Sequence, residues 1–174
     1  GIETTLIFHE GLDLPHFAAF HLLQDTEGTE ALRRYFRRHA TIATANGLGF
    51  VLESPTWRAS PDWGAKLGYA LDDLDAANRT SIELMEDLRR ELQTPRSPMV
   101  ISGCVGPRGD GYDPGTVMTP EEAEAYHAVQ IASFARTAAD QVTAITMTNA
   151  EEAIGVTRAA RRAGLPVAIS FTVE

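Results

Sequence analysis

Short apolar runs alternate with well-capped helices along the chain, and this alternation limits the possible folds more than any other feature of the sequence. The runs are continuous rather than interrupted by polar residues, as is typical of strands buried on both faces of a parallel sheet. Strands are expected at residues 6–8, 50–52, 99–101, 142–147 and 167–169. A strand and a helix about every 40 residues predict a β/α architecture, either an open doubly wound sheet or part of a (β/α)8 barrel.

Capping signals mark where the helices between these strands should begin and end. A Ser, Thr or Asn side chain at a helix start accepts a bond from a free backbone N–H, and a Glu three residues later completes a capping box. Pro stops a helix, and Gly adopts the left-handed conformation that ends one. The expected starts are Thr29, Ser60, Thr119 and Asn149, and the expected ends are Gly47, Pro95 and Gly164.

Composition excludes several classes of protein. The 174 residues, with a mass of 18.9 kDa, suffice for one domain core. The net charge of -9 argues against binding to nucleic-acid phosphates, which needs clustered Lys and Arg. No apolar run approaches the roughly 20 residues of a membrane span, and the N-terminus lacks the apolar segment of a signal peptide. Cys104 is the one cysteine, so an internal disulfide is impossible and a cytoplasmic location is expected.

The loops after the predicted strands are where a β/α protein places its functional residues. These loops are residues 53–60, 104–113, 146–149 and 172–174. In the first of these loops, Trp57 and Arg58 predict a small-molecule pocket whose floor they form and which the charge of Arg58 polarises. The alternative is structural: Trp57 covers the rim of the sheet, and Arg58 pairs with Glu53 or Asp62.

The Gly-rich residues 102–111 follow the third predicted strand and have two interpretations. The backbone N–H groups of such a loop can bind a phosphate, but the spacing fits neither a Walker loop nor a dinucleotide fingerprint, and Pro107 removes a donor. The alternative is a tight loop that lets a ligand or another strand end come close. Cys104, within this stretch, is expected to be a small buried residue rather than a nucleophile.

The histidines have no spacing typical of a metal site. They are His9, His16, His21, His39 and His127. His39 and His127 fall on apolar helix faces, where a hydrogen-bonded packing role is expected. The sequence therefore predicts no metal site within these 174 residues.

Several motifs, taken together and in this order, resemble those of the homocysteine S-methyltransferase family. Residues 1–6 resemble the end of its first-strand motif, and Thr56-Trp57-Arg58-Ala59-Ser60 resembles its second-strand motif. Ala77-Asn78-Arg79 matches the start of the following helix. Gly103-Cys104-Val105-Gly106-Pro107 matches the third-strand motif, with Cys in place of Ser, and residues 127–131, 151–153 and 164–167 continue the match. The resemblance covers essentially the whole chain.

This resemblance implies a (β/α)8 TIM barrel, a single domain of which residues 1–174 form the N-terminal part, about strands 1–5. It implies transfer of a methyl group from a small donor to the sulfur of homocysteine, or of a related thiol or selenol, giving methionine. It also implies a zinc ion, held by three cysteines beyond residue 174, that binds the substrate as a thiolate. The implied substrate-binding residues are Gly1, Ile2, Trp57 and Arg58. A homo-oligomer is compatible with such an enzyme.

Two departures from the family pattern concern the amino group of homocysteine. Ile145 stands where the family usually has an acidic residue that holds this group, and the family's other acidic anchor, an Asp, would precede Gly1. Burying an ammonium without a carboxylate is costly, so Glu3 and Glu53 are candidate replacements. Two alternatives stay open: a diverged or inactive family member that binds another metabolite, and a self-contained doubly wound binding module. Half a barrel leaves open strand edges, so we expect the protein to continue past Glu174.

Overall fold

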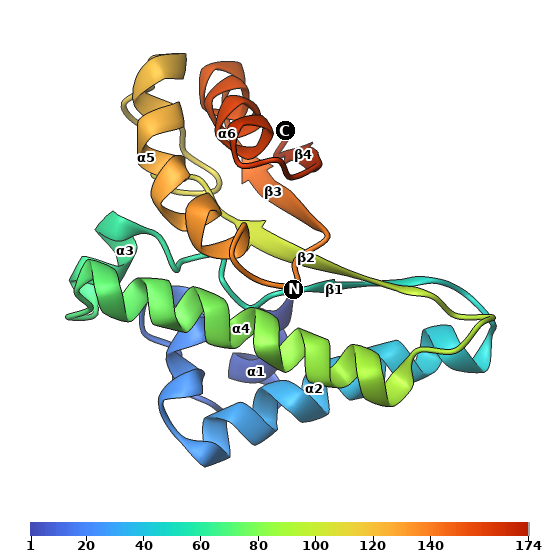
Figure 1. The fold of residues 1–174 in the computed structure, drawn as a ribbon. Coiled ribbons are helices and arrows are strands. Elements are labelled where there is room, and N and C mark those ends of the chain that lie inside the picture. The colour runs from blue at the N-terminus through green and yellow to red at the C-terminus, as the bar shows by residue number, and fades with distance from the viewer. Residues whose placement is uncertain (174) are drawn as a thin grey trace.

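In the computed structural model, which describes residues 1–173, helices alternate with the strands of one parallel sheet (Figure 1). The strands are β1 (Phe50–Glu53), β2 (Met99–Val105), β3 (Gln141–Met147) and β4 (Val167–Phe171). The helices are α1 (Ile2–Phe8), α2 (Thr26–Ala45), α3 (Pro61–Lys66), α4 (Leu71–Leu92), α5 (Pro120–Phe134) and α6 (Ala150–Arg162). Two short 3-10 segments, η1 (Pro15–Phe17) and η2 (Ala19–Gln24), connect α1 to α2.

The strands lie side by side in the order β1-β2-β3-β4, and every pair is parallel. This confirms the predicted β/α architecture. A doubly wound sheet reverses its strand order at the point where the ligand binds, whereas a barrel keeps the order of the chain. Within the described residues the order shows no reversal, and the sheet is open rather than closed into a barrel.

The expected strand at residues 6–8 was wrong, because these residues end helix α1. The hydrogen bond from Thr5 N to Gly1 O, at 3.2 Å, closes a helical turn, so the backbone donors are satisfied locally. Leu6 is fully buried whereas Phe8 is 75% exposed, as expected when one face of a helix contacts the core. The described sheet therefore has four strands rather than five.

Two predicted helices begin or continue differently from the sequence expectation. The second helix in the chain, α2, starts at Thr26 because the Asp25 carboxylate accepts a hydrogen bond from Gly28 N at 2.7 Å. Thr29, the predicted cap, lies inside that helix. The region after Ser60 is two helices, α3 and α4, separated near Gly68, whose φ of +83° interrupts the helix. The predicted starts at Thr119 and Asn149 are confirmed.

Helices cover one face of the sheet and leave the other without a helical layer (Figure 1). Gly103 lies so close to α5 that a Cβ there would come within 2.5 Å of the Phe134 ring. On the opposite face, Val51 and Val100 remain 44% and 36% exposed. The core sits between the sheet and the helices and includes Leu32, Leu52, Ile82, Met85, Leu88, Ile101, Ile131, Phe134 and Val142.

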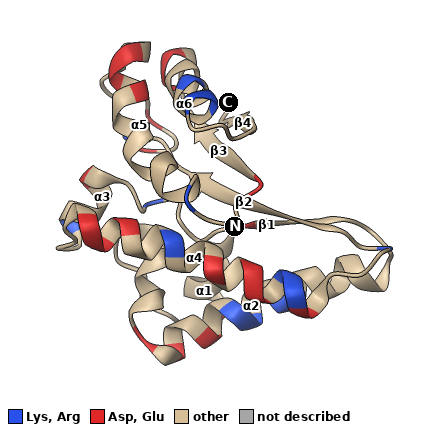
Figure 2. Ribbon diagram, in the orientation of Figure 1, with Lys and Arg blue, Asp and Glu red and all other residues tan. Residues whose placement is uncertain are grey.

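Residues of both charge signs lie along α2 and α4 (Figure 2). Arg37 binds Glu91 at 2.8 Å, and Arg33 lies 3.3 Å from Asp87, so ion pairs join the two helices. Such exposed pairs contribute little to stability, because water and salt screen them. None of the helices in residues 1–173 is long and apolar enough to cross a membrane.

Candidate functional site

The loops that follow the strands meet at the carboxyl edge of the sheet, as predicted. The Trp57 indole Nε1, after β1, donates a hydrogen bond of 3.0 Å to the Thr146 hydroxyl at the end of β3. The Thr172 hydroxyl, after β4, donates one of 2.8 Å to Gly111 O in the loop after β2. Residues from four chain segments are thereby held together at one edge of the sheet.

Arg58, next to Trp57 in the loop after β1, is 4% exposed. Its Cζ atom lies 3.8 Å from the centroid of the Trp57 ring and 3.7 Å from that of Trp63. One guanidinium nitrogen, Nη1, donates to Gly109 O at 3.0 Å. Burial lowers the pKa of Arg58 to about 10, although Asp110 and Glu3 act in the opposite direction. The guanidinium is therefore a buried cation that keeps its charge at neutral pH.

The structural alternative for Arg58 was wrong in its partners. Among the described residues, neither Glu53 nor Asp62 forms an ion pair with Arg58. Asp62 instead accepts a bond of 2.7 Å from Nε of Arg108, whose guanidinium lies over the Tyr126 ring. Trp57 and Arg58, the pair singled out in the sequence, are brought together with Trp63, which sequence reasoning missed.

The glycines of the loop after β2 permit a close approach of this loop to Trp57. A Cβ at Gly106 would lie 2.4 Å from Trp57 O, and one at Gly111 would lie 3.0 Å from the Trp57 ring. Side chains at either position would push the loop and the indole apart. The geometry supports the tight-loop interpretation of residues 102–111.

A buried polar network fixes the segment just before Trp57 and Arg58. The Gln130 amide Nε2, on α5, donates to Thr56 O at 2.9 Å and to Asn78 Oδ1 at 3.0 Å. Asn78, on α4, in turn donates to Ala59 O at 3.0 Å. The Thr56 hydroxyl donates to Cys104 O at 2.7 Å. The family-like motif residues Thr56, Ala59 and Asn78 thus hold the loop in place.

Cys104 lies on β2, 3% exposed, beside the carboxylates at this edge. Burial raises the pKa of its thiol well above the ordinary value, and the nearby charges of Glu53 and Glu3 raise it further. A thiol with a raised pKa is protonated at neutral pH and is a poor nucleophile. The predicted role of Cys104 as a small buried residue is confirmed.

The two candidate acidic anchors, Glu3 and Glu53, are half-buried. Desolvation raises the pKa of Glu3, and its own backbone, the N-terminus and Arg58 lower it in part. Desolvation also raises the pKa of Glu53, and the hydroxyl groups of Thr143 and Ser102 act in the opposite direction. Glu53 Oε2 is buried without a hydrogen-bond partner among residues 1–173. Desolvation of both carboxyl groups is an energetic cost that a cation nearby would relieve.

Gly1 and Ile2, the other two predicted site residues, form the start of α1. Gly1 precedes the helix as its N-cap, and a Cβ on it would lie 3.3 Å from Glu3 Oε2. Ile2 is partly buried against the main core. Because the charge of Glu3 affects the pKa of both Arg58 and Cys104, the first turn of α1 lies near the carboxyl edge of the sheet.

The end of β3 has an irregular backbone that sequence reasoning missed. The pairing of β3 with β4 shifts register between Ala144 and Met147, and Thr146 has a φ of +55°. A positive φ is costly for a β-branched residue, and such strain is concentrated at functional positions. The strain turns the Thr146 hydroxyl toward Trp57. The preceding Ile145 is half-buried and supplies no charge.

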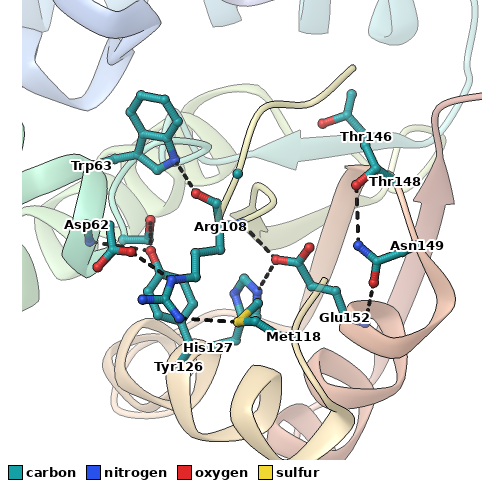
Figure 3. A network of polar contacts seen from close by, with 12 residues as sticks. Asp62, Trp63, Arg108, Met118, Tyr126, His127, Thr146, Thr148, Asn149 and Glu152 are labelled. Atoms are coloured by element: carbon teal, nitrogen blue, oxygen red, sulfur yellow. Dashed lines mark hydrogen bonds and ion pairs between the residues drawn. The ribbon is translucent and has the colours of Figure 1, made fainter. Parts of the chain in front are cut away.

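His127 packs inside the protein, as predicted, and it anchors the loop after β2 (Figure 3). Its Nε2 lies 2.9 Å from Glu152 Oε1, which also accepts a hydrogen bond of 2.7 Å from Arg108 N. Desolvation acts to raise the pKa of Glu152, but the bonds from His127 and from Arg108 N hold it below its usual value. His39 likewise makes a local bond, from Nδ1 to Tyr35 O at 2.8 Å. Both histidines have the hydrogen-bonded packing role expected of them.

Within the described residues, neither a cluster of metal ligands nor the cavity between η2 and α4 identifies the site. No group of three His, Cys, Asp or Glu side chains in residues 1–173 lies close enough together to hold a metal ion. A cavity of 450 Å³ between η2 and α4 is lined by Phe20, Tyr69 and Thr80, among others, and contains none of the predicted site residues. The carboxyl edge, with its buried cation and strained backbone, remains the candidate site.

Comparison with known proteins agrees with this fold and with the motifs. A crystal structure of the homocysteine methyltransferase MmuM from Escherichia coli, in its metallated form, matches with a TM-score of 0.78 and 18% identity over 99% of this chain. The oxidized form of the same enzyme matches with a TM-score of 0.80 and 18% identity over 98% of this chain. The chain covers 61% and 60% of those two chains.

At this identity the likeness to the solved structures shows the fold alone. No curated protein matches the sequence significantly. The family model described as homocysteine S-methyltransferase, however, matches residues 1–174, the whole length of the chain. The chain therefore belongs to the homocysteine S-methyltransferase family.

Proposed function

We propose that the full-length protein transfers a methyl group from a small donor to the sulfur of homocysteine, or of a related thiol or selenol. The observation that carries this proposal is the family match over residues 1–174. A parallel sheet with the strand order of a barrel, similar to that of a homocysteine methyltransferase, supports it. On the same grounds we propose that residues 1–174 form the N-terminal part of a single (β/α)8 barrel, consistent with the 61% share of the neighbour's chain that they cover.

In this proposal the residues of the chain bind and orient the thiol rather than react with it. Gly1, Ile2, Trp57 and Arg58 line the substrate site at the carboxyl edge of the sheet, where barrel enzymes place their active sites. Trp57 provides an apolar wall that its bond to Thr146 holds in position. Cys104 keeps its proton at neutral pH, so the substrate supplies the sulfur that accepts the methyl group.

The family implies a zinc ion, and the residues of this chain do not fit one. Among residues 1–173 no three potential ligands cluster, and the one cysteine is buried with a raised pKa. A structural or catalytic zinc site takes three or four such ligands. Zinc in the full-length protein would need ligands from outside the described residues, and we assign no step of the reaction to it.

A second candidate is a family member that binds a different small metabolite. The observation in its favour is Ile145, which leaves the end of β3 without the expected carboxylate. Under either candidate the partners are small molecules, namely a substrate and, for the enzyme, a methyl donor. We propose a cytoplasmic location from the single cysteine and leave open a homo-oligomer.

An assay of label transfer separates these candidates. The full-length protein is incubated with homocysteine and with sulfonium or quaternary ammonium donors labelled in the methyl group, and labelled thioether is quantified. We expect labelled methionine from the wild-type protein. Trp57→Ala should lower the rate of methyl transfer about 100-fold, because the apolar wall is removed. Ile42→Ala, at an exposed position on α2, should leave the rate unchanged. Absence of transfer to any thiol, with the protein folded and loaded with zinc, would favour the second candidate.

A further inference from the structure

The guanidinium of Arg58 is a buried charge without an ion pair. The side chain is 4% exposed, yet no carboxylate oxygen among residues 1–173 lies within 4.0 Å of it. Its Nε is buried and has no hydrogen-bond partner among these residues. Burying a charge without a partner is costly and is rarely retained unless the group has a function.

Two tryptophan rings cover the guanidinium of Arg58, so a ligand can bind it only along the edge that carries its N–H groups. Trp57 and Trp63 lie against the guanidinium at 3.8 Å and 3.7 Å. Gly109 O takes one bond from Nη1, and the Nε side has no acceptor in the described residues. A planar guanidinium held in this way presents two parallel N–H donors, which match the two oxygens of a carboxylate.

Arg58 stays charged at neutral pH although no carboxylate of the described residues pairs with it. Its pKa, lowered by burial to about 10, keeps the group protonated at neutral pH, and the negative charges of Asp110 and Glu3 contribute to this. Neither Asp110 nor Glu3 makes a direct ion pair with it in the described part of the chain. The position of the cation is fixed by the stacked rings and by Gly109 O, so it is preorganised for an anion.

We propose that Arg58 is the anchor for the carboxylate of the thiol substrate, and that this contact outweighs recognition of the substrate's amino group. The inference rests on the proposed function above and specifies the substrate class as a thiol that carries a carboxylate. The apolar Ile145 supplies no partner for an ammonium at the end of β3, whereas Arg58 supplies one for a carboxylate. The substrate's amino group, for which Glu3 and Glu53 are the remaining candidate partners, then contributes less to binding than its carboxylate does.

A series of three thiols tests the proposal on the wild-type full-length protein by calorimetry. Homocysteine carries both groups, 4-mercaptobutanoate lacks the amino group, and 3-mercaptopropylamine lacks the carboxylate. We expect the first two to bind within about tenfold of each other and the third to bind at least about 30-fold more weakly, because a buried charge pair has lost one partner. Equal or tighter binding of 3-mercaptopropylamine would overturn the proposal.

Variants then assign the effect to this residue. Arg58→Met should remove the preference for the carboxylate, so that 4-mercaptobutanoate and 3-mercaptopropylamine bind equally weakly, and Arg58→Lys should restore part of it. Arg108→Met is the matched control, since Arg108 also lies over an aromatic ring at this edge but is paired with Asp62. A preference that persists in Arg58→Met, or vanishes equally in Arg108→Met, would contradict the assignment.

A thiol-free measurement separates this inference from the proposed reaction. Trp57 and Trp63 are the two tryptophans of the 174 residues, and both contact Arg58. Butanoate should therefore change the tryptophan fluorescence saturably in the wild type and not in Arg58→Met, and butylamine should have no such effect. A carboxylate response without methyl transfer would refute the reaction alone, whereas transfer without any carboxylate preference would refute the inference alone.

Discussion

Replacing Gln130 by Met tests whether buried hydrogen bonds hold the candidate site in place. Gln130 is 1% exposed on α5, and its amide donates to Thr56 O and Asn78 Oδ1. Met has nearly the same length and flexibility, so it fills the space without donating. The substitution therefore removes the donor while it preserves the packing.

The magnitude follows from the groups left behind. Thr56 O and Asn78 Oδ1 would lose a donor, and each buried acceptor without a donor costs about 1–3 kcal/mol. Gln130 Oε1 has no partner among the described residues, so removal of this acceptor returns part of that cost. We expect a net loss of about 2 kcal/mol in the free energy of unfolding.

Urea unfolding of the full-length protein, followed by circular dichroism, measures this loss as a lower midpoint at unchanged slope. Gln24→Met, at an exposed position in η2, is the matched control and should change stability by less than about 0.5 kcal/mol. Thiol binding should weaken as well, because Thr56 directly precedes Trp57 and Arg58. A change below about 0.5 kcal/mol in Gln130→Met would refute the view that this network fixes the site.

Three further substitutions test the electrostatics and packing around the site. Glu53→Gln should stabilise the protein at pH 7, because the raised pKa of Glu53 means that its ionised form is costly in the folded state. The gain in stability should vanish below the ordinary pKa of 4.5, where Glu53 is protonated in both the folded and the unfolded states. If Glu53→Gln leaves homocysteine affinity unchanged, Glu53 is not the ammonium anchor. Glu152→Gln should destabilise the protein at pH 7 and much less near pH 3. The lowered pKa of Glu152 means that its carboxylate stabilises the folded state only while it is ionised beside His127. Equal losses of stability at the two pH values, measured by urea unfolding, would contradict this. Gly155→Ala should lower the melting temperature through a loss of about 1–3 kcal/mol, since its Cβ would lie 2.4 Å from Ala123 Cβ; an unchanged melting temperature would show that α5 and α6 can separate freely.

Local sequence signals predicted the regular part of the fold because they act through neighbouring residues. Continuous apolar runs identified the strands β1 to β4, and the side chains of Thr119 and Asn149 cap α5 and α6 as expected. The run at residues 6–8 failed for the same reason, since three apolar residues in sequence fit a strand or one side of a short helix. Only the absence of a neighbouring strand decides between them.

The arrangement of the candidate site was predicted only in part, because its residues come from loops joined by long-range contacts. Trp57 and Arg58 were identified from the sequence. The second indole, Trp63, lies on α3, whose start at Ser60 was predicted, but its contact with Arg58 is a tertiary contact that no local pattern predicts. The carboxylate partners expected for Arg58 were wrong, because the ring stacking places the guanidinium away from them.

A crystal structure of the full-length protein with bound homocysteine tests the central claim most directly. The account predicts the ligand at the carboxyl edge of the sheet, with its carboxylate bonded to the Arg58 guanidinium and its hydrocarbon chain against Trp57. Homocysteine bound elsewhere, for example in the 450 Å³ cavity beside Tyr69, with Arg58 still lacking an anionic partner, would contradict it.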